Sequence, residues 1–145
     1  MNIGLYQLLL FSIIVIFSLI LSAQDIKRMA VEIYLQWAGI ITALACHLIF
    51  ARDTMWIYVL SGTLMGAFYF GVRMITKGKL GMADIWFGLF QGLFLVPKMI
   101  PVCLGIECLA ALCVINKRFG KEEFPFIPFM SAGLIAAYII QLIFM

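Results

Sequence analysis

Two aspartates have the residue type and the placement that a hydrolytic site needs. Asp25 directly follows the first long apolar stretch, and Asp84 opens another one, behind Gly78, Gly81 and Ala83. Paired carboxyl groups suit hydrolysis, because an ionised one takes a proton from water while a protonated one donates to the carbonyl oxygen. Close carboxyl groups split their titrations into a low and a high apparent pKa, which supplies both roles.

A simpler interpretation of the two aspartates stays open beside this one. Each carboxyl group can serve only to end a helix, as we expect for Asp53. At a helix N-terminus, Asp84 would be stabilised in its ionised form by the helix dipole. The sequence alone does not establish that Asp25 and Asp84 meet.

The composition of the remaining chain is that of a membrane protein. Hydrophobic residues make up 66% of the 145 residues and charged residues 12%, against about half and a quarter in soluble proteins. The net charge is only +3, and no basic cluster is long enough to follow the phosphates of a nucleic acid. We therefore expect an all-α integral membrane protein, a single domain over residues 1–145, that binds no nucleic acid.

Apolar stretches long enough to cross a bilayer set the expected helices. A crossing takes about 20 apolar residues. Four such stretches are clear: 3–23, 33–51, 54–72 and 124–145. The stretch 84–116 is too long for one helix and contains Pro97, Lys98 and Pro101 near its middle. Prolines interrupt a helix, and a lysine is costly inside the bilayer.

The distribution of Lys and Arg decides how this stretch is divided. Two helices there make six spans, and the loops on one side then carry eight Lys and Arg residues against two on the other. One long helix would give five against four. Cytoplasmic loops are enriched in Lys and Arg. We therefore expect six transmembrane helices, both termini outside the cytoplasm, and both aspartates on the cytoplasmic face.

The fourth of these helices is expected to be unusually short. It covers residues 85–97, which is about 20 Å at a rise of 1.5 Å per residue. It cannot cross a full bilayer, so we expect its end at Asp84 to lie below the lipid surface, in a polar notch.

Three motifs follow one another in an order that resembles a known family. The first span ends in Asp25-Ile26-Lys27-Arg28, and Gly81-Met82-Ala83-Asp84 opens the short helix. Phe124-Pro125-Phe126-Ile127-Pro128-Phe129 precedes the last span. Over nearly its whole length, the chain resembles the type IV prepilin leader peptidases, which are membrane aspartyl proteases of the GxGD class. It is similar to the minimal members, which lack the N-terminal four-cysteine region and in which cleavage is not usually joined to methylation.

The resemblance implies both a function and a set of site residues. Asp25 and Asp84 would be the catalytic dyad, with Lys27, Gly81 and Ala83 as supporting motif positions. The reaction would remove the leader peptide of a prepilin-like precursor, in type IV pilus assembly or secretion, without a metal or organic cofactor. The protein would lie among the lipids of a bacterial or archaeal inner membrane, with its active site facing the cytoplasm.

The chain departs from the family pattern at three places. Ala83 stands where a second glycine is usual, and Trp86 where a lysine is common. Val31-Glu32-Ile33 replaces an Ile-Pro-Asn. These departures leave open a catalytically inactive, peptidase-like assembly subunit as an alternative.

Glu107, His47 and the four cysteines are other residues whose side chains can carry chemistry. Glu107 lies near the middle of the fifth span, where an ionisable group is a functional candidate by default; it would be protonated, paired within the bundle, or beside a cavity. His47 is expected near the interface and away from the aspartates. The four cysteines match no metal-ligand spacing, and we expect them to be small buried hydrophobes.

A small proton- or ion-coupled transporter is the main alternative from another class. Asp25, Asp84 and Glu107 would then be relay sites. The two halves of the chain show no obvious repeat of the kind that many transporters have, which favours the peptidase.

Overall fold

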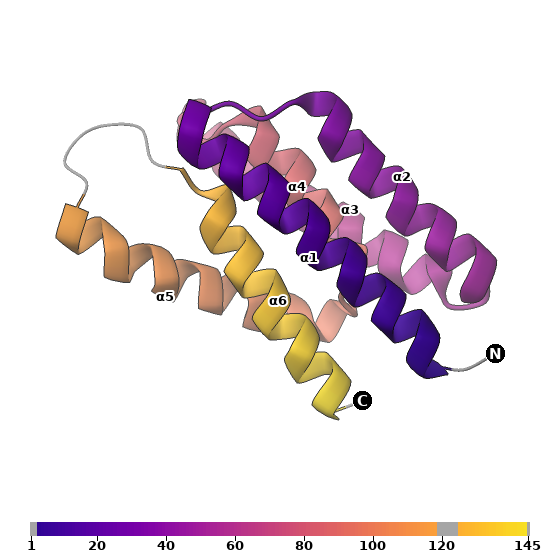
Figure 1. Ribbon diagram of the computed structural model, residues 1–145. Coiled ribbons are helices and arrows are strands. Elements are labelled where there is room, and N and C mark those ends of the chain that lie inside the picture. Colours follow the sequence, from indigo (N-terminus) through magenta and orange to yellow (C-terminus); the bar gives the residue numbers. More distant parts are fainter. Residues whose placement is uncertain (1–2, 119–124, 145) are drawn as a thin grey trace.

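The computed structural model describes residues 3–118 and 125–144, and its helices follow the apolar stretches of the sequence. Figure 1 shows their arrangement. The helices are α1 (Ile3–Arg28), α2 (Ile33–Phe50), α3 (Met55–Ile75), α4 (Met82–Gly92), α5 (Ile100–Arg118) and α6 (Ile127–Phe144). The chain is thus an all-α membrane protein, and among its described residues five helices, all but α4, are long and apolar enough to cross a membrane.

The expected division of the stretch 84–116 is confirmed. Helix α4 ends at Gly92, Pro97–Met99 form a 3₁₀ turn, and α5 starts at Ile100. Val96 is extended, with φ −75° and ψ 153°, because a residue before proline is disfavoured in the helical region. The short helix begins and ends earlier than expected, at Met82 and Gly92 instead of residues 85 and 97. Similarly, α1 continues to Arg28, so Asp25 lies inside the helix and does not follow it.

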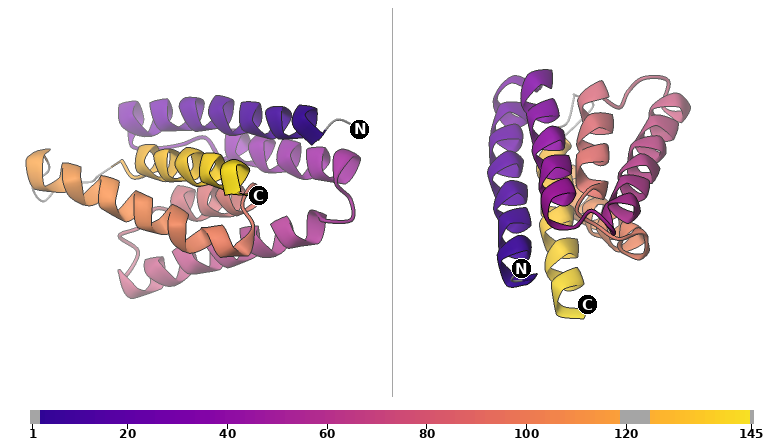
Figure 2. Two further views of the ribbon diagram at one scale, coloured as in Figure 1. Left: turned by 90° about the horizontal axis from the view of Figure 1, so that it is seen from below. Right: turned by 90° about the vertical axis from the view of Figure 1, so that its right-hand side faces the viewer.

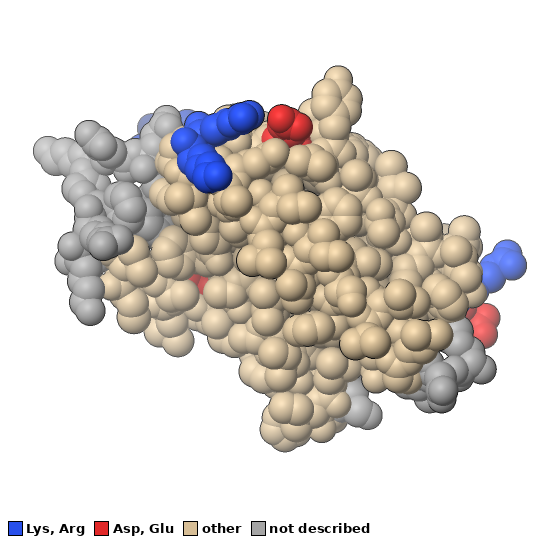
Figure 3. Space-filling view, in the orientation of Figure 1, with Lys and Arg blue, Asp and Glu red and all other residues tan. Residues whose placement is uncertain are grey.

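The helices run back and forth between two ends of a bundle. At one end, α1 and α3 finish and α2 and α4 begin; we call this the aspartate end. Both chain termini, the α2–α3 loop and the α4–α5 turn lie at the opposite end, the terminal end (Figures 1 and 2). Helix α5 crosses α6 obliquely (Figure 2). In the space-filling view, charged side chains gather at opposite edges of the face and leave an almost uncharged surface between them (Figure 3), as expected for a bundle surrounded by lipid.

Short α4 lies at the centre of the bundle, packed against α2, α3 and α6. Phe87, Phe90 and Gln91 of this helix are at most 1% exposed. Its approach to α3 depends on small residues, because a β-carbon at Gly92 would lie 2.5 Å from the Cα of Gly62. Small residues allow membrane helices to pack closely, which holds α4 and its Asp84 firmly against α3.

Candidate active site

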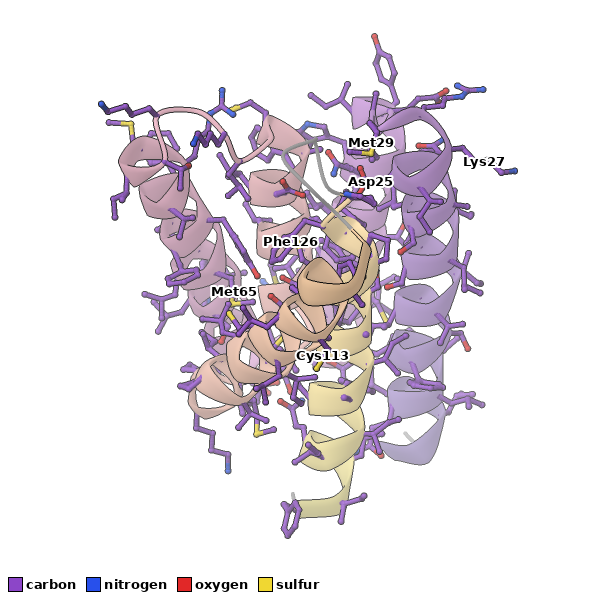
Figure 4. The ribbon with its side chains drawn as sticks, turned by 90° about the vertical axis from the view of Figure 1, so that its left-hand side faces the viewer. Asp25, Lys27, Met29, Met65, Cys113 and Phe126 are labelled. Carbon is purple, nitrogen blue, oxygen red and sulfur yellow. The ribbon has the colours of Figure 1, made fainter. Side chains whose placement is uncertain are left out.

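Asp25 and Asp84 line the same cavity at the aspartate end of the bundle. The cavity has a volume of about 750 Å³. One aspartate comes from the last turns of α1 and the other from the first turn of α4. Figure 4 shows Asp25 at this end, near Phe126 and Met29, which also line the cavity. Two carboxyl groups that are 59 positions apart in the sequence therefore face one space.

Asp25 is held by the beginning of α6. Its Oδ2 accepts a hydrogen bond of 3.1 Å from the backbone N–H of Ile127, the first residue of that helix. The side chain is 8% exposed. A carboxylate at a helix N-terminus is stabilised in its ionised form by the helix dipole and by the free N–H groups there. The Ile127 hydrogen bond therefore favours the ionised form of Asp25, while the burial of the carboxyl group opposes it.

Asp84 is held by its own helix. Its Oδ2 accepts a hydrogen bond of 3.1 Å from the N–H of Gly81, the residue that caps α4. The side chain is 9% exposed. Burial, and secondly the negative charge of Asp25, raise the pKa of Asp84 from 3.8 to about 6, against the lowering effect of the Gly81 hydrogen bond. Asp84 thus keeps its proton to a higher pH than an ordinary aspartate.

Each aspartate leaves one carboxyl oxygen uncommitted. Among the backbone groups and side chains that the structure describes, the Oδ1 atoms of Asp25 and Asp84 accept no hydrogen bond. A helix cap uses a single oxygen of each group, so the capping role foreseen in the sequence and a chemical role are compatible. The second oxygens remain for a water molecule or a substrate carbonyl.

The wall of the cavity is formed by both apolar and polar groups. Its apolar side chains include Val31, Val72, Leu80 and Phe126, and its polar ones Thr76 and Lys79. Arg73 of α3 donates a hydrogen bond to the carbonyl of Leu80, which ties down the loop that precedes α4. Ligand sites usually combine apolar side chains with a small number of placed polar groups.

The remaining motif positions differ in how close they lie to the aspartates. Gly81 caps α4 and donates to Asp84, and Ala83 lines the cavity. The Ala83 carbonyl accepts a 2.8 Å hydrogen bond from Gln36 of α2. Its backbone is not in the left-handed region, so no glycine is required there. Lys27 is exposed and points away from Asp25 (Figure 4), while the Trp86 ring packs on Trp37 at 5.0 Å between centroids.

Glu107 is paired within the bundle, one of its three expected environments. It is 1% exposed and does not line the aspartate cavity. Its Oε2 accepts a hydrogen bond from the Tyr69 hydroxyl, and its Oε1 accepts from Gln91 and, at 3.0 Å, from the Cys103 thiol. Sequence reasoning missed Tyr69 and Gln91. A polar residue in an apolar span was the only available signal for Gln91.

His47 lies in the last turn of α2 and does not line the aspartate cavity, as expected, but its burial was not foreseen. It is 0% exposed and bonds to Tyr6 and to the carbonyl of Leu93, both at 2.6 Å. The expectation for the cysteines was wrong in part. Of the four cysteines, Cys108 and Cys113 are exposed on α5, because the oblique path of α5 leaves much of its surface uncovered. Cys46 and Cys103 are buried as expected.

Comparisons with known proteins add nothing to this geometry. No protein-family model, curated protein or solved structure matches the chain. Among the described residues, no three His, Cys, Asp or Glu side chains come together in a way that could hold a metal ion. Within the part of the chain that the structure describes, the ionisable side chains that line the cavity are Asp25, Asp84 and Lys79.

Proposed function

We propose that the protein is a membrane aspartyl endopeptidase that removes the leader peptide of prepilin-like precursors. The observation that carries the proposal is the meeting of Asp25 and Asp84 at one cavity, at the end of a membrane bundle. The motif order that resembles the prepilin peptidases supports the choice of substrate. Neither a metal nor an organic cofactor is needed.

The environments of the two carboxyl groups support a division of roles between them. Asp25, which accepts a hydrogen bond from the N-terminus of α6, is the ionised base. Asp84, whose pKa is raised to about 6, is the acid. Asp25 takes a proton from water as the water oxygen attacks the scissile carbonyl carbon, and Asp84 protonates the carbonyl oxygen. As the tetrahedral intermediate collapses, the C–N bond breaks, the leaving nitrogen takes the proton from Asp25, and Asp84 regains its own.

The charges at the two ends of the bundle support a cytoplasmic active site. Lys27, Arg28, Lys77 and Lys79 lie at the aspartate end, against Arg52 and Lys98 at the terminal end. Because cytoplasmic loops are rich in Lys and Arg, the aspartate end faces the cytoplasm and both termini lie outside it. The family resemblance suggests the inner membrane of a bacterium or an archaeon. A precursor's hydrophobic stem would stay in the bilayer while its leader reaches the cavity.

The surroundings of Glu107 favour a peptidase over a proton- or ion-coupled transporter. A relay would need Glu107 to connect with the aspartates, but Glu107 does not line their cavity and its oxygens bond to Tyr69, Gln91 and Cys103. A relay would fail in the Glu107→Gln variant, whereas a peptidase would largely survive this change.

The test is cleavage of a prepilin-like precursor by purified protein in detergent, followed by mass spectrometry. Asp25→Asn and Asp84→Asn should each lower the rate about 10²–10⁴-fold, the usual contribution of a positioned acid or base. Asp53→Asn is the matched control, because Asp53 is exposed in the α2–α3 loop at the terminal end; it should cleave at the wild-type rate.

Two results would overturn the proposal. One is wild-type cleavage by either the Asp25→Asn or the Asp84→Asn variant. The other is a folded wild type that leaves intact a precursor that a related active peptidase cleaves. That second result would favour an inactive assembly subunit.

A further inference from the structure

The first turns of α6 hold both helices that carry the aspartates. On one side, Asp25 of α1 binds the N–H of Ile127, and Ser22 of α1 hydrogen-bonds to Ser131 at 2.9 Å. On the other side, Gln91 of α4 donates a 2.8 Å hydrogen bond to the carbonyl of Met130. Helix α6 is therefore hydrogen-bonded to both α1 and α4, and it helps to fix their positions relative to each other.

Gln91 lies on the same face of α4 as Asp84. The two residues are seven positions apart, which is two turns of helix and about 10.5 Å along its axis. A shift of α4 that breaks the hydrogen bond between Gln91 and Met130 must move Asp84 as well. Because α6 also binds Asp25, the hydrogen bond between Gln91 and Met130 fixes the position of the Asp84 carboxyl group along the bundle axis relative to that of Asp25.

Glu107 fixes the direction of the Gln91 amide. The Gln91 Nε2 atom donates one hydrogen to Met130 and the other to Glu107 Oε1, so both of its hydrogens are used. Its Oε1 is buried and has no hydrogen-bond partner among the described residues. Leaving a buried oxygen unpaired is unfavourable, so the amide is oriented by what its nitrogen binds.

We infer that Gln91, oriented by Glu107, is a positioning residue that sets the alignment of Asp84 with Asp25. This inference rests on the proposed peptidase function, and neither side chain touches the substrate. The hydrogen-bonded cluster of Tyr69, Gln91, Cys103 and Glu107 would then contribute to the reaction through α4, the helix that carries Asp84.

The terminal end of the same bundle provides a matched control for Gln91. Gln141 of α6 is also a buried glutamine, 5% exposed, that bonds to backbone groups of the α4–α5 turn. Its Oε1 accepts from the N–H of Val96 at 2.8 Å and its Nε2 donates to the carbonyl of Phe94 at 3.0 Å. Gln141→Leu therefore makes the same chemical change far from the aspartates.

The experiment compares Gln91→Leu with Gln141→Leu in three measurements. These are the thermal unfolding midpoint in detergent, the titration of the Asp84 carboxyl group by infrared difference spectroscopy against Asp84→Asn, and kcat and KM for the precursor. Both variants should lose thermal stability. Only Gln91→Leu should move the Asp84 pKa toward the ordinary value and lower kcat, by at least about tenfold, with KM nearly unchanged.

Variants of the partner residues complete the test. Glu107→Gln keeps an oxygen that accepts from Gln91, so it should retain most of the wild-type kcat, while Glu107→Leu should resemble Gln91→Leu. Tyr69→Phe removes only the hydroxyl group that bonds to Glu107 Oε2. This variant should lower kcat and shift the Asp84 pKa in the same direction as Gln91→Leu, but by less. The Tyr69→Phe variant serves as the test if the leucine variants do not fold.

The inference is overturned if Gln91→Leu and Gln141→Leu have the same kcat and the same Asp84 titration. In the absence of folded leucine variants, wild-type values of both quantities in Tyr69→Phe overturn it. If the wild type cleaves no precursor, the peptidase proposal fails, and the Asp84 titration alone still decides whether Gln91 holds α4 in place.

Discussion

The two ends of the bundle bury polar side chains in opposite ways. At the terminal end, both nitrogens of His47 have partners, and its ring stacks on Tyr58 with 4.5 Å between centroids. The nearby cavity, lined in part by Tyr6, Tyr58 and Gln141, has a volume of only about 60 Å³. At the aspartate end, Asp25 and Asp84 face a cavity of about 750 Å³, and each has one oxygen without a hydrogen-bond partner among the described groups.

This difference separates polar groups that hold helices together from polar groups that remain available for chemistry. His47 and Gln141 use their donors and acceptors on other helices and turns, which is what buried polar groups in a stable bundle normally do. Asp25 and Asp84 bind helix N-termini with one oxygen each, and their other oxygens have no partner among the groups that the structure describes. A buried polar residue in a membrane helix is thus not in itself a functional site.

The largest effect expected from this contrast outside catalysis is a pH dependence of stability. The pKa of Asp84 is about 6 in the folded protein against 3.8 for an ordinary aspartate, so the folded form binds more protons between these values. Its contribution to the free energy of unfolding is present below pH 4 and is lost as the pH rises through 6; it amounts to about 3 kcal/mol at most. Thermal unfolding in detergent from pH 4 to 8 measures it.

Asp84→Asn should make this pH profile less steep, since the buried Asp25 and Glu107 carboxyl groups remain in the variant, and Asp53→Asn should leave the profile unchanged. A profile that is as steep in Asp84→Asn as in the wild type would mean that another group carries the titration.

A smaller effect is expected at the terminal end. His47→Phe keeps a ring against Tyr58 but removes the hydrogen bonds to Tyr6 and Leu93. Buried groups that lose their partners cost about 1–3 kcal/mol, so the unfolding midpoint should fall. The rate of precursor cleavage, measured below the new midpoint, should stay within about twofold, because catalysis depends on distant groups. A large loss of cleavage without unfolding would contradict the division between the two ends.

The smallest effect is expected at Lys27, although it belongs to the motif that begins at Asp25. Its side chain is exposed and points away from the cavity (Figure 4). Lys27→Ala should change stability by less than about 0.5 kcal/mol, as exposed substitutions usually do, and should leave kcat unchanged. A rise in KM alone would show that Lys27 contacts the precursor, while a fall in kcat would place it in the reaction.

The sequence was sufficient for the helices because hydropathy and helix breakers are local signals. Apolar runs located the five long helices, and Pro97 with Lys98 indicated where the stretch 84–116 turns. The convergence of the two aspartates was only suggested, since Asp25 and Asp84 reach one cavity through the packing of α1, α4 and α6.

The remaining polar contacts depend on tertiary packing, which a single sequence does not reveal. Gln91 meets Met130 across 39 residues, and Tyr69 meets Glu107 across 38. No local pattern specifies which helix faces will adjoin. The burial of His47 was not foreseen for the same reason: it comes from Tyr6 and Tyr58, which belong to two other helices.

The most direct test of the central claim is whether the two aspartates act as one unit. Precursor cleavage is measured for Asp25→Asn, Asp84→Asn and the double variant under the same conditions. Catalytic groups that act together are strongly non-additive, so the double variant should retain the same residual rate as the slower single variant. A double variant whose loss is the product of the two single losses would contradict the account, because the carboxyl groups would then act independently.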